Sequence, residues 1–223
     1  MPKNSSEGSS RSRIEVVEEP GLNNSTGQRL WDCAVIMTLC LMQDPSILVP
    51  GERDTCSRLQ IIELGAGCGV AGQVAEAAAY QLSGTGLRAS LVFTDVPETV
   101  DTSLAVNLAR NAPIDNVSRI VRSLTWGPLH EKECLAALPA SLDAKVTILA
   151  TDVLYNTSSH DDLLWTVKRL LQPFTAETAQ FLLTYKPRTE GDSDFFDKAR
   201  AVGIECTMIQ LKGDISLWRC IQL

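Results

Sequence analysis

Residues 59–72, LQIIELGAGCGVAG, join an apolar run to three closely spaced glycines. The glycines stand at positions 65, 67 and 69, and an alanine-rich segment follows over residues 70–82. A buried strand that leads through a glycine-rich turn into a helix is the usual way in which an α/β protein binds an adenosine-containing cofactor. The pattern therefore predicts an α/β fold with a ligand site at the strand ends.

Largely apolar segments alternate with helical segments along the rest of the chain. This alternation is typical of a parallel sheet covered on both faces by helices. The chain ends in two strand-like segments around the turn KGD, which predict an antiparallel hairpin. The fold class is therefore α/β, with a seven-stranded, mostly parallel sheet. The expected strands are 59–64, 90–95, 119–126, 145–155, 179–187, 204–211 and 215–223, and the expected helices are 70–82, 97–111, 158–172 and 193–203.

The first part of the chain precedes this pattern. Residues 1–12 are polar and serine-rich, a composition that predicts disorder. Residues 13–19 alternate enough for a short strand, and the apolar residues of 28–43 recur at helical spacing. We expect one domain with no internal repeat. Its divisions are a tail (1–12) and a domain (13–223) made of an N-terminal strand and helix segment (13–58) and a sheet core (59–223).

The charge and apolar content exclude some classes of partner. The chain carries 27 acidic and 20 basic side chains, a net charge of −7, whereas nucleic-acid binding generally needs a basic face. No apolar run approaches the roughly 20 residues of a membrane-spanning helix, and the N-terminus lacks the apolar core of a secretory signal. We expect no nucleic-acid or membrane partner, and a monomer in the cytoplasm, with the nucleus as a second location.

The seven cysteines include no C-x-x-C pair. In a protein without a secretory signal they are expected to be reduced thiols. The chain has two histidines, His130 and His160, and no second Cys/His pair completes a tetrahedral set around them. No metal site is expected.

The glycine spacing distinguishes two classes of adenosine cofactor. A dinucleotide fingerprint reads G-x-G-x-x-G, and Val70 stands where its third glycine would be. No P-loop lysine follows, so nucleotide hydrolysis is not indicated. Asp95, at the tip of the next strand, can accept hydrogen bonds from ribose hydroxyls or, alternatively, cap the helix that begins near Pro97. Together these features favour S-adenosyl-L-methionine over NAD.

A series of short motifs follows the chain in order: TGQRLWDCA (26–34), IIELGAGCGVAG (61–72), FTD (93–95), NLARN (107–111), LTWG (124–127), ATDVLY (150–155) and YKPR (185–188). On these motifs the chain resembles the seven-stranded, Rossmann-like class I methyltransferases. Within that class it is similar to the lysine methyltransferase family often called family 16, the methyltransferase-like 21 type. The resemblance covers about residues 13–221, and members of that family methylate lysines on chaperones, elongation factors and calmodulin.

The resemblance implies which residues bind S-adenosyl-L-methionine. Trp31 matches a residue of the segment that closes over the methionine part, and Asp95 matches the ribose ligand. Trp126 matches a residue beside the adenine, and Ala150 a small residue that leaves room for the cofactor. The alternative for Trp31 is a core aromatic on an amphipathic helix, and for Trp126 a side chain that fills the edge of the sheet. The implied cofactor-binding positions are Trp31, Glu63, Gly65, Ala66, Gly67, Asp95, Trp126 and Ala150.

Asp152 and Tyr155 match the family's D-x-x-Y motif, which lies beside the acceptor lysine. A lysine has an unperturbed pKa of about 10.4 and is not nucleophilic while protonated. The resemblance implies that Asp152 orients the amine and that Tyr155 contacts the aliphatic stem and the methylammonium by cation–π interaction. The alternatives are a helix cap for Asp152 and a packed tyrosine for Tyr155.

The expected function is S-adenosyl-L-methionine-dependent N-methylation of a lysine on a protein substrate. One alternative is N-methylation of a small molecule or a nucleobase. Nucleic-acid amino-methyltransferases typically carry N/D-P-P-Y after the fourth strand, to hold a flipped base, whereas this chain has D-V-L-Y and an acidic net charge. The other alternative is an inactive cofactor-binding scaffold, which the intact motif positions disfavour.

Overall fold

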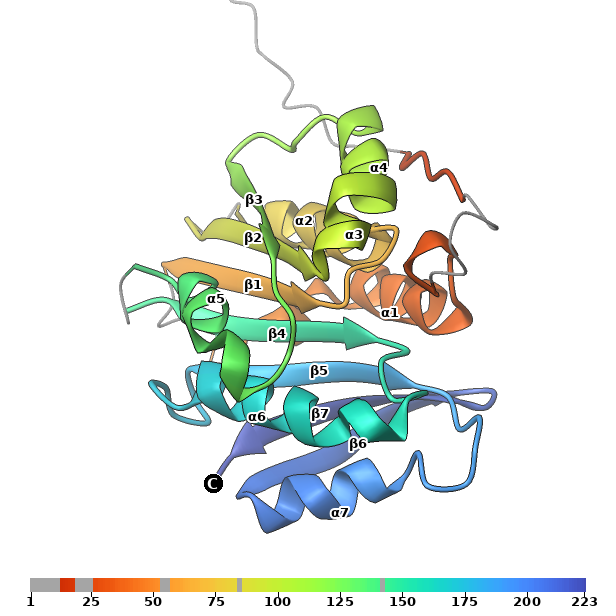
Figure 1. Cartoon of the computed structure of the whole chain (residues 1–223). Helices are drawn as coiled ribbons and strands as arrows, with labels where there is room; N and C mark the ends of the chain where they lie inside the picture. Colours follow the sequence, from red (N-terminus) through yellow and green to blue (C-terminus); the bar gives the residue numbers. More distant parts are fainter. Residues whose placement is uncertain (1–12, 19–25, 53–56, 84–85, 141–142) are drawn as a thin grey trace, which may run out of the picture.

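The computed structural model of the chain describes residues 13–18, 26–52, 57–83, 86–140 and 143–223. The strands are β1 Arg58–Leu64, β2 Arg88–Asp95, β3 Val117–Ser123, β4 Lys145–Thr151, β5 Ala179–Tyr185, β6 Ile204–Lys212 and β7 Ile215–Gln222. They form one sheet in the order β3-β2-β1-β4-β5-β7-β6 (Figure 1). β7 is antiparallel to both of its neighbours, and the other adjacent pairs are parallel. The predicted Rossmann-like, mostly parallel sheet with a C-terminal hairpin is confirmed.

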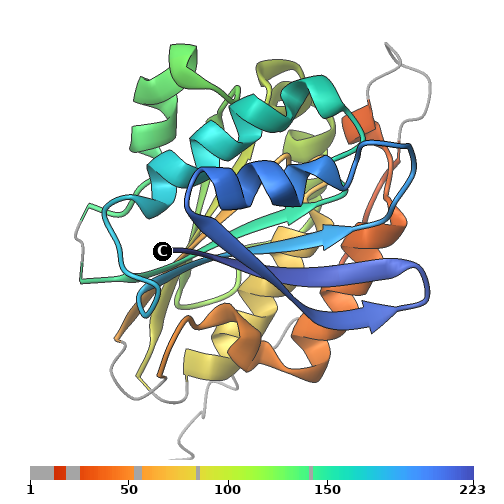
Figure 2. The same ribbon diagram turned by 90° about the horizontal axis from the view of Figure 1, so that it is seen from below.

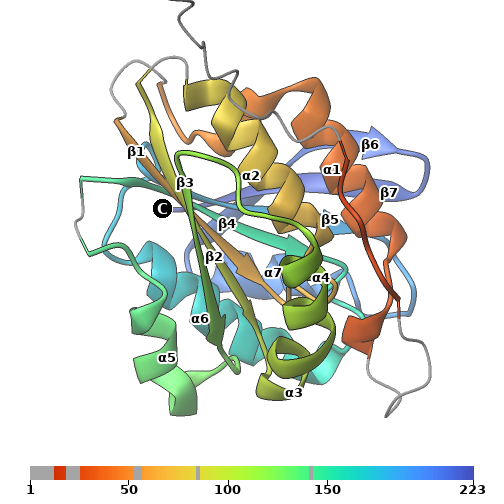
Figure 3. The same ribbon diagram turned by 90° about the horizontal axis from the view of Figure 1, so that it is seen from above.

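Helices cover both faces of the sheet (Figures 2 and 3). α1, α2 and α4 lie on one face, and α5, α6 and α7 lie on the other. Successive residues of β1 enter opposite layers, because Ile61 packs in the first layer and Ile62 in the second, and both are fully buried. The helices are α1 Asp32–Gln43, α2 Val70–Leu82, α3 Pro97–Thr99, α4 Ala105–Arg110, α5 Glu131–Ala136, α6 His160–Leu171 and α7 Asp194–Ala201.

The chain reverses its progress across the sheet at β1. β1 pairs with β2 on one side, and after β3 the chain returns to pair β4 with the other side of β1. In open α/β sheets ligands bind at such a switch point, outside the carboxyl ends of the strands. This arrangement places the end of β1, with the glycines that follow it, at the expected ligand site.

The strand expected over residues 13–19 is not formed, since residues 13–18 have no strand assignment. These residues are held instead by two asparagines on α4. Asn107 accepts from the amide of Val17 (2.7 Å) and donates to its carbonyl (3.1 Å), and Asn111 does the same for Glu15 (2.9 and 2.7 Å). The main chain of Glu15 and Val17 therefore bonds to side-chain amides and not to a neighbouring strand. The disorder expected for residues 1–12 lies outside the described residues.

The helices near the ligand site differ from the expected boundaries. The helix expected over 28–43 begins at Asp32, so Trp31 is its N-cap residue. The helix expected over 97–111 contains a π-helical turn, Val100–Leu104, between α3 and α4. Such turns are a local irregularity that apolar periodicity does not reveal.

β3 and β4 end several residues earlier than expected. β3 ends at Ser123, which leaves Trp126 in the following loop. β4 ends at Thr151, because Asp152 adopts a left-handed φ of 57° that no strand can continue. The short helix α5 was not predicted. Both loops thereby carry their motif residues beyond the sheet edge.

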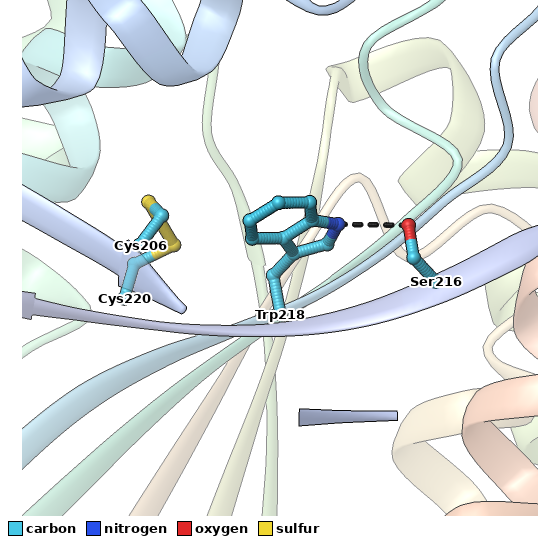
Figure 4. Close-up of a disulfide and its surroundings, with 4 residues drawn as sticks. All are labelled: Cys206, Ser216, Trp218 and Cys220. Atoms are coloured by element: carbon cyan, nitrogen blue, oxygen red, sulfur yellow. Dashed lines mark hydrogen bonds between the residues drawn. A yellow bond between two sulfur atoms is a disulfide. The ribbon is translucent and has the colours of Figure 1, made fainter. Parts of the chain in front are cut away.

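The expectation that the cysteines are reduced is wrong for one pair. Cys206 on β6 and Cys220 on β7 lie opposite one another and form a disulfide (Figure 4). Beside them Trp218 donates its indole N–H to Ser216 Oγ at 2.7 Å. The pairing depends on the register of the hairpin, which the linear spacing of the cysteines does not reveal. Cys33, Cys40, Cys68 and Cys134 are free and buried.

Two properties concern the described residues as a whole. None of the helices in this part of the chain is long and apolar enough to cross a membrane. Within the same residues, no group of three or more His, Cys, Asp or Glu side chains is arranged to hold a metal ion.

The asparagine clamp on residues 13–18 leads to a first prediction. We expect Asn111→Ala to lower the free energy of unfolding by about 1–3 kcal/mol, because it removes a nearly buried amide that makes several hydrogen bonds. It should also speed hydrogen exchange at the amide of Glu15. Urea unfolding and amide exchange measure the two effects. The control is Arg110→Ala, an exposed position on the same helix. Equal exchange in the two variants would contradict the clamp.

Candidate active site

A cleft of about 320 Å³ opens at the carboxyl ends of β1, β2 and β4. Residues before and within the first turns of α1 form part of its wall. The predicted site residues that line it are Trp31, Gly65, Ala66, Gly67, Asp95, Trp126, Asp152 and Tyr155. Glu63 and Ala150 do not line the cleft and are 1% and 0% exposed, respectively. Their roles in cofactor binding stay predictions.

The first glycine of the loop is required by its conformation and by its neighbours. Gly65 has a φ of 65°, which side chains rarely adopt. A Cβ atom there would lie 3.2 Å from Cγ1 of Val153 and 3.3 Å from Cζ2 of Trp126. The next amide, of Ala66, donates to the carbonyl of Thr94 on β2 (2.9 Å). The loop therefore presents bare main chain, held to the neighbouring strand, to whatever occupies the cleft.

The N-terminal segment sits directly on this loop. The carbonyl of Gly27 accepts from Ser103 Oγ (3.1 Å), and the thiol of Cys68 lies 3.6 Å from it. A Cβ atom on Gly67 would lie 3.3 Å from the same carbonyl. Gly27 was not predicted to be a site residue, although its place in the motif TGQRLWDCA pointed to the ligand site. Its contacts show that this motif closes one side of the cleft.

Asp95 is held by main-chain amides on both carboxylate oxygens. Oδ2 accepts from the amide of Gly67 (2.8 Å) and Oδ1 from the amide of Val96 (2.7 Å). Burial raises the pKa of Asp95, while these two bonds and one from Thr99 oppose the rise. The N-cap residue of α3 is Val96, so Asp95 is not its cap. With these three donors, the carboxylate keeps a lone pair that can accept a hydrogen bond from a ligand in the cleft.

Glu63 lies behind the glycine loop, on the side of α2. Its Oε1 accepts from the amide of Gly72 (3.0 Å), and its Oε2 is buried without a hydrogen-bond partner. Burial raises the pKa of Glu63 to about 8, against the hydrogen bond from Gly72, and the charge of Asp95 adds to the rise. The side chain is therefore largely protonated at neutral pH. In this position it supports the start of α2 rather than touching the cleft.

The two tryptophans come from different segments, the loop after β3 and the residues before α1. Trp126 is half-buried, packs against the core beyond β3 and presents its ring edge to Gly65. Trp31, also half-buried, precedes α1 and lies beneath the guanidinium of Arg188, whose carbon is 5.1 Å from the ring centroid. Both rings line the cleft, and their roles in cofactor binding stay predictions.

The two D-x-x-Y residues both line the cleft, but their surroundings differ. Asp152 is almost buried, and Arg188 donates to both of its oxygens, with Nε at 3.1 Å from Oδ1. The thiol of Cys33 also bonds to it, and burial followed by the charge of Asp152 raises the pKa of Cys33. Tyr155 is 48% exposed. Asn156, and not Asp152, caps the turn before α6, which removes the capping alternative.

The comparisons with known proteins identify the family. A family model described as lysine methyltransferase matches residues 10–202. This chain belongs to that family. The family consists of S-adenosyl-L-methionine-dependent methyltransferases, in agreement with the cofactor predicted from the sequence.

Individual relatives are more distant. Protein N-lysine methyltransferase METTL21A of Mus musculus is 30% identical over 166 residues, 74% of this chain and 63% of that protein. Histone-arginine methyltransferase METTL23 of Xenopus laevis is 25% identical over 209 residues, 92% of this chain and 76% of that protein. The crystal structure of a methyltransferase from Pyrococcus furiosus matches in fold, with a TM-score of 0.52 and 12% identity over 94% of this chain and 88% of its own. The chain thus spans less than two thirds of the mouse protein.

The walls of the cleft fit S-adenosyl-L-methionine. The Cβ-free positions of Gly65 and Gly67 allow close approach of the ligand to the main chain. Asp95 lines the cleft and offers an acceptor for a ribose hydroxyl. Trp126 adds a flat apolar wall on which a base can pack. All of these groups face a single cavity.

Gly65 gives a prediction with a closely matched control. We expect Gly65→Ala to weaken binding of S-adenosylhomocysteine about tenfold or more, because the new methyl group meets Trp126 and Val153. Gly213→Ala introduces the same strain, with a φ of 64°, but its Cβ meets nothing within 4 Å. Both variants should lose similar stability in urea, about 1–2 kcal/mol. Calorimetric titration measures the binding, and equal affinities in the two variants would refute the close approach.

Glu63 gives a prediction about pH. Its folded pKa of about 8 lies above the ordinary value of 4.5, so between these values the folded state holds a proton that the unfolded state has lost. The free energy of unfolding should therefore fall as pH rises through this window, by at most about 1.4 kcal/mol per unit. We expect Glu63→Gln to remove this fall. The stability of the variant relative to wild type should therefore increase from about pH 5 to about pH 8. Urea unfolding at several pH values measures it.

The control for this experiment is Glu98→Gln, an exposed carboxylate near the same cleft. Its stability curve should run parallel to that of wild type. A parallel curve for Glu63→Gln as well would show that Glu63 is ionised in the folded protein.

Proposed function

We propose that the protein is an S-adenosyl-L-methionine-dependent protein-lysine N-methyltransferase. The observation that carries the proposal is the meeting of two groups of residues on one cleft. Gly65, Gly67 and Asp95 line the cleft together with Asp152 and Tyr155. Membership of the lysine methyltransferase family supports the same reaction.

The residues of the chain bind and orient the two reactants. Asp95 accepts from the ribose hydroxyls, and Trp126 packs against the adenine. Trp31 closes over the methionine part and limits access of water. Bound S-adenosyl-L-methionine supplies a methyl group on a positively charged sulfur. Because the transfer is an in-line displacement, positioning supplies most of the rate that the protein provides.

The acceptor end selects an amine on a long side chain. Tyr155 lines the cleft and is exposed, so its ring can contact the aliphatic stem and the cationic product. Asp152 is fixed by Arg188 and keeps lone pairs for the acceptor N–H groups. The amine must be neutral to attack, and the C–N bond forms as the C–S bond breaks. The product ammonium then releases its proton to solvent before any second transfer.

A protein-arginine acceptor is the second candidate. METTL23 of Xenopus laevis, named as a histone-arginine methyltransferase, aligns with 92% of this chain. The finer prediction of a chaperone or translation-factor substrate rests on the family resemblance alone. Identifying the modified protein and the modified residue would answer which substrate is used and whether the acceptor is lysine or arginine.

The test is transfer of labelled methyl groups from S-adenosyl-L-methionine to proteins of a cell lysate, followed by mass spectrometry. We expect methyl-lysine on a discrete protein, and a 10- to 100-fold loss with Asp95→Ala, since charge-assisted hydrogen bonds to the ribose are removed. The control is Asp101→Ala, an exposed carboxylate close by that does not line the cleft. Methyl-arginine would favour the second candidate. Label in RNA or small metabolites, or none despite cofactor binding, would refute the proposal.

A further inference from the structure

Arg188 lies in the loop after β5 and contacts two residues that line the cleft. Arg188 itself does not line it. Its guanidinium donates through Nε and through its terminal nitrogen to the two oxygens of Asp152. The same guanidinium lies over the ring of Trp31, 5.1 Å from the centroid. A planar guanidinium is suited to this task, because it forms a two-point bond in its plane and stacks with its face.

The loop that carries Arg188 is itself anchored. Asp192 is fully buried and accepts from the amides of Arg188 (2.9 Å) and Thr189 (3.0 Å), and from the hydroxyl of Thr189. Burial alone would raise the pKa of Asp192, but these hydrogen bonds outweigh it and hold the pKa below its usual value. The anchored carboxylate fixes the main chain from which the Arg188 side chain extends.

Asp152, the partner of Arg188 in this ion pair, is also held in place. The side chain of Asp152 is 5% exposed, and its left-handed backbone is tied to β5 by a bond from its amide to the carbonyl of Thr184 (3.0 Å). A carboxylate buried to this degree is costly unless it is paired, so the position of Arg188 is strongly determined. Cys33, Asp32 and Asp214 are charged or titratable neighbours of the ion pair between Arg188 and Asp152.

We propose that Arg188 is a positioning residue that sets the Trp31 ring against the bound cofactor and the Asp152 carboxylate toward the acceptor amine. Arg188 touches neither reactant and acts through the two side chains that do. The inference rests on the proposed function for the identity of the cofactor, and its test uses cofactor binding alone, without any protein substrate.

The test is calorimetric titration of the full chain with S-adenosylhomocysteine. We expect Arg188→Ala to weaken binding about 5- to 30-fold, the range that corresponds to loss of a partly desolvated cation–π contact. Arg188→Lys should recover little, because an ammonium cannot make the two-point bond and stack at once. Lys186→Ala is the matched control, since this nearby cation pairs with Asp32 and Asp214 and does not line the cleft.

Two further measurements separate positioning from a general structural effect. Guanidinium ion at low millimolar concentration should restore binding to Arg188→Ala by filling the vacated place. It should not restore binding when Trp31→Leu is also present. The effects of Arg188→Ala and Trp31→Leu should be non-additive, with the double variant no weaker than Trp31→Leu alone.

Arg188→Ala leaves the nearly buried carboxylate of Asp152 without its cationic partner, which can destabilise the fold. The variant Arg188→Ala with Asp152→Asn removes that charge, and the same loss of affinity is expected from it. Wild-type affinity in the Arg188 variants, or additive effects with Trp31→Leu, would overturn the inference alone. Wild-type protein that fails to bind S-adenosylhomocysteine would overturn the proposed function together with it.

Discussion

The reversal of the chain between β1 and β4 is the constraint on which the whole cleft depends. Because the loops after these two adjacent parallel strands lead to opposite layers of helices, a gap opens at their carboxyl ends. The gap becomes a binding site only if one wall lacks side chains, and Gly65 and Gly67 provide that wall. Asp95 joins this loop to the end of β2 through the amide of Gly67. Main-chain bonds, and not long side chains, therefore set the floor of the site.

Three carboxylates around this floor are stabilised in different ways, and the difference matches their roles. Asp95 has amide donors and an opening to the cleft, which suit an acceptor for hydroxyl groups. Asp152 is almost buried and is paired with the guanidinium of Arg188, which bonds to both of its oxygens. Glu63 has one amide donor and a partnerless oxygen, so burial dominates and favours the neutral acid. Residue type alone does not distinguish these cases, because the number and charge of the hydrogen-bond donors determine how each carboxylate is stabilised.

The sheet, its hairpin and the walls of the cleft were predictable because they depend on short-range patterns. Apolar runs such as that around Ile61 identify buried strands. Asp95 could be predicted because it is the last residue of such a strand. Contacts between distant segments were not predictable in the same way. Arg188 and Asp152 are 36 residues apart, and Glu15 and Asn111 are 96 apart. The disulfide depends on hairpin register, and the left-handed Asp152 on local backbone, neither of which apolar periodicity encodes.

The N-terminal segment shows what these distant contacts achieve. Its residues 13–18 join no strand ladder, and it is held by asparagine side chains on α4, by the contact of Gly27 with the glycine loop, and by Arg188 on Trp31. A segment fixed by a few separate bonds can open locally at a cost well below that of global unfolding. Gly27 and Trp31 of this segment line the cleft. The separate contacts that hold the segment in place therefore also hold one wall of the proposed cofactor site.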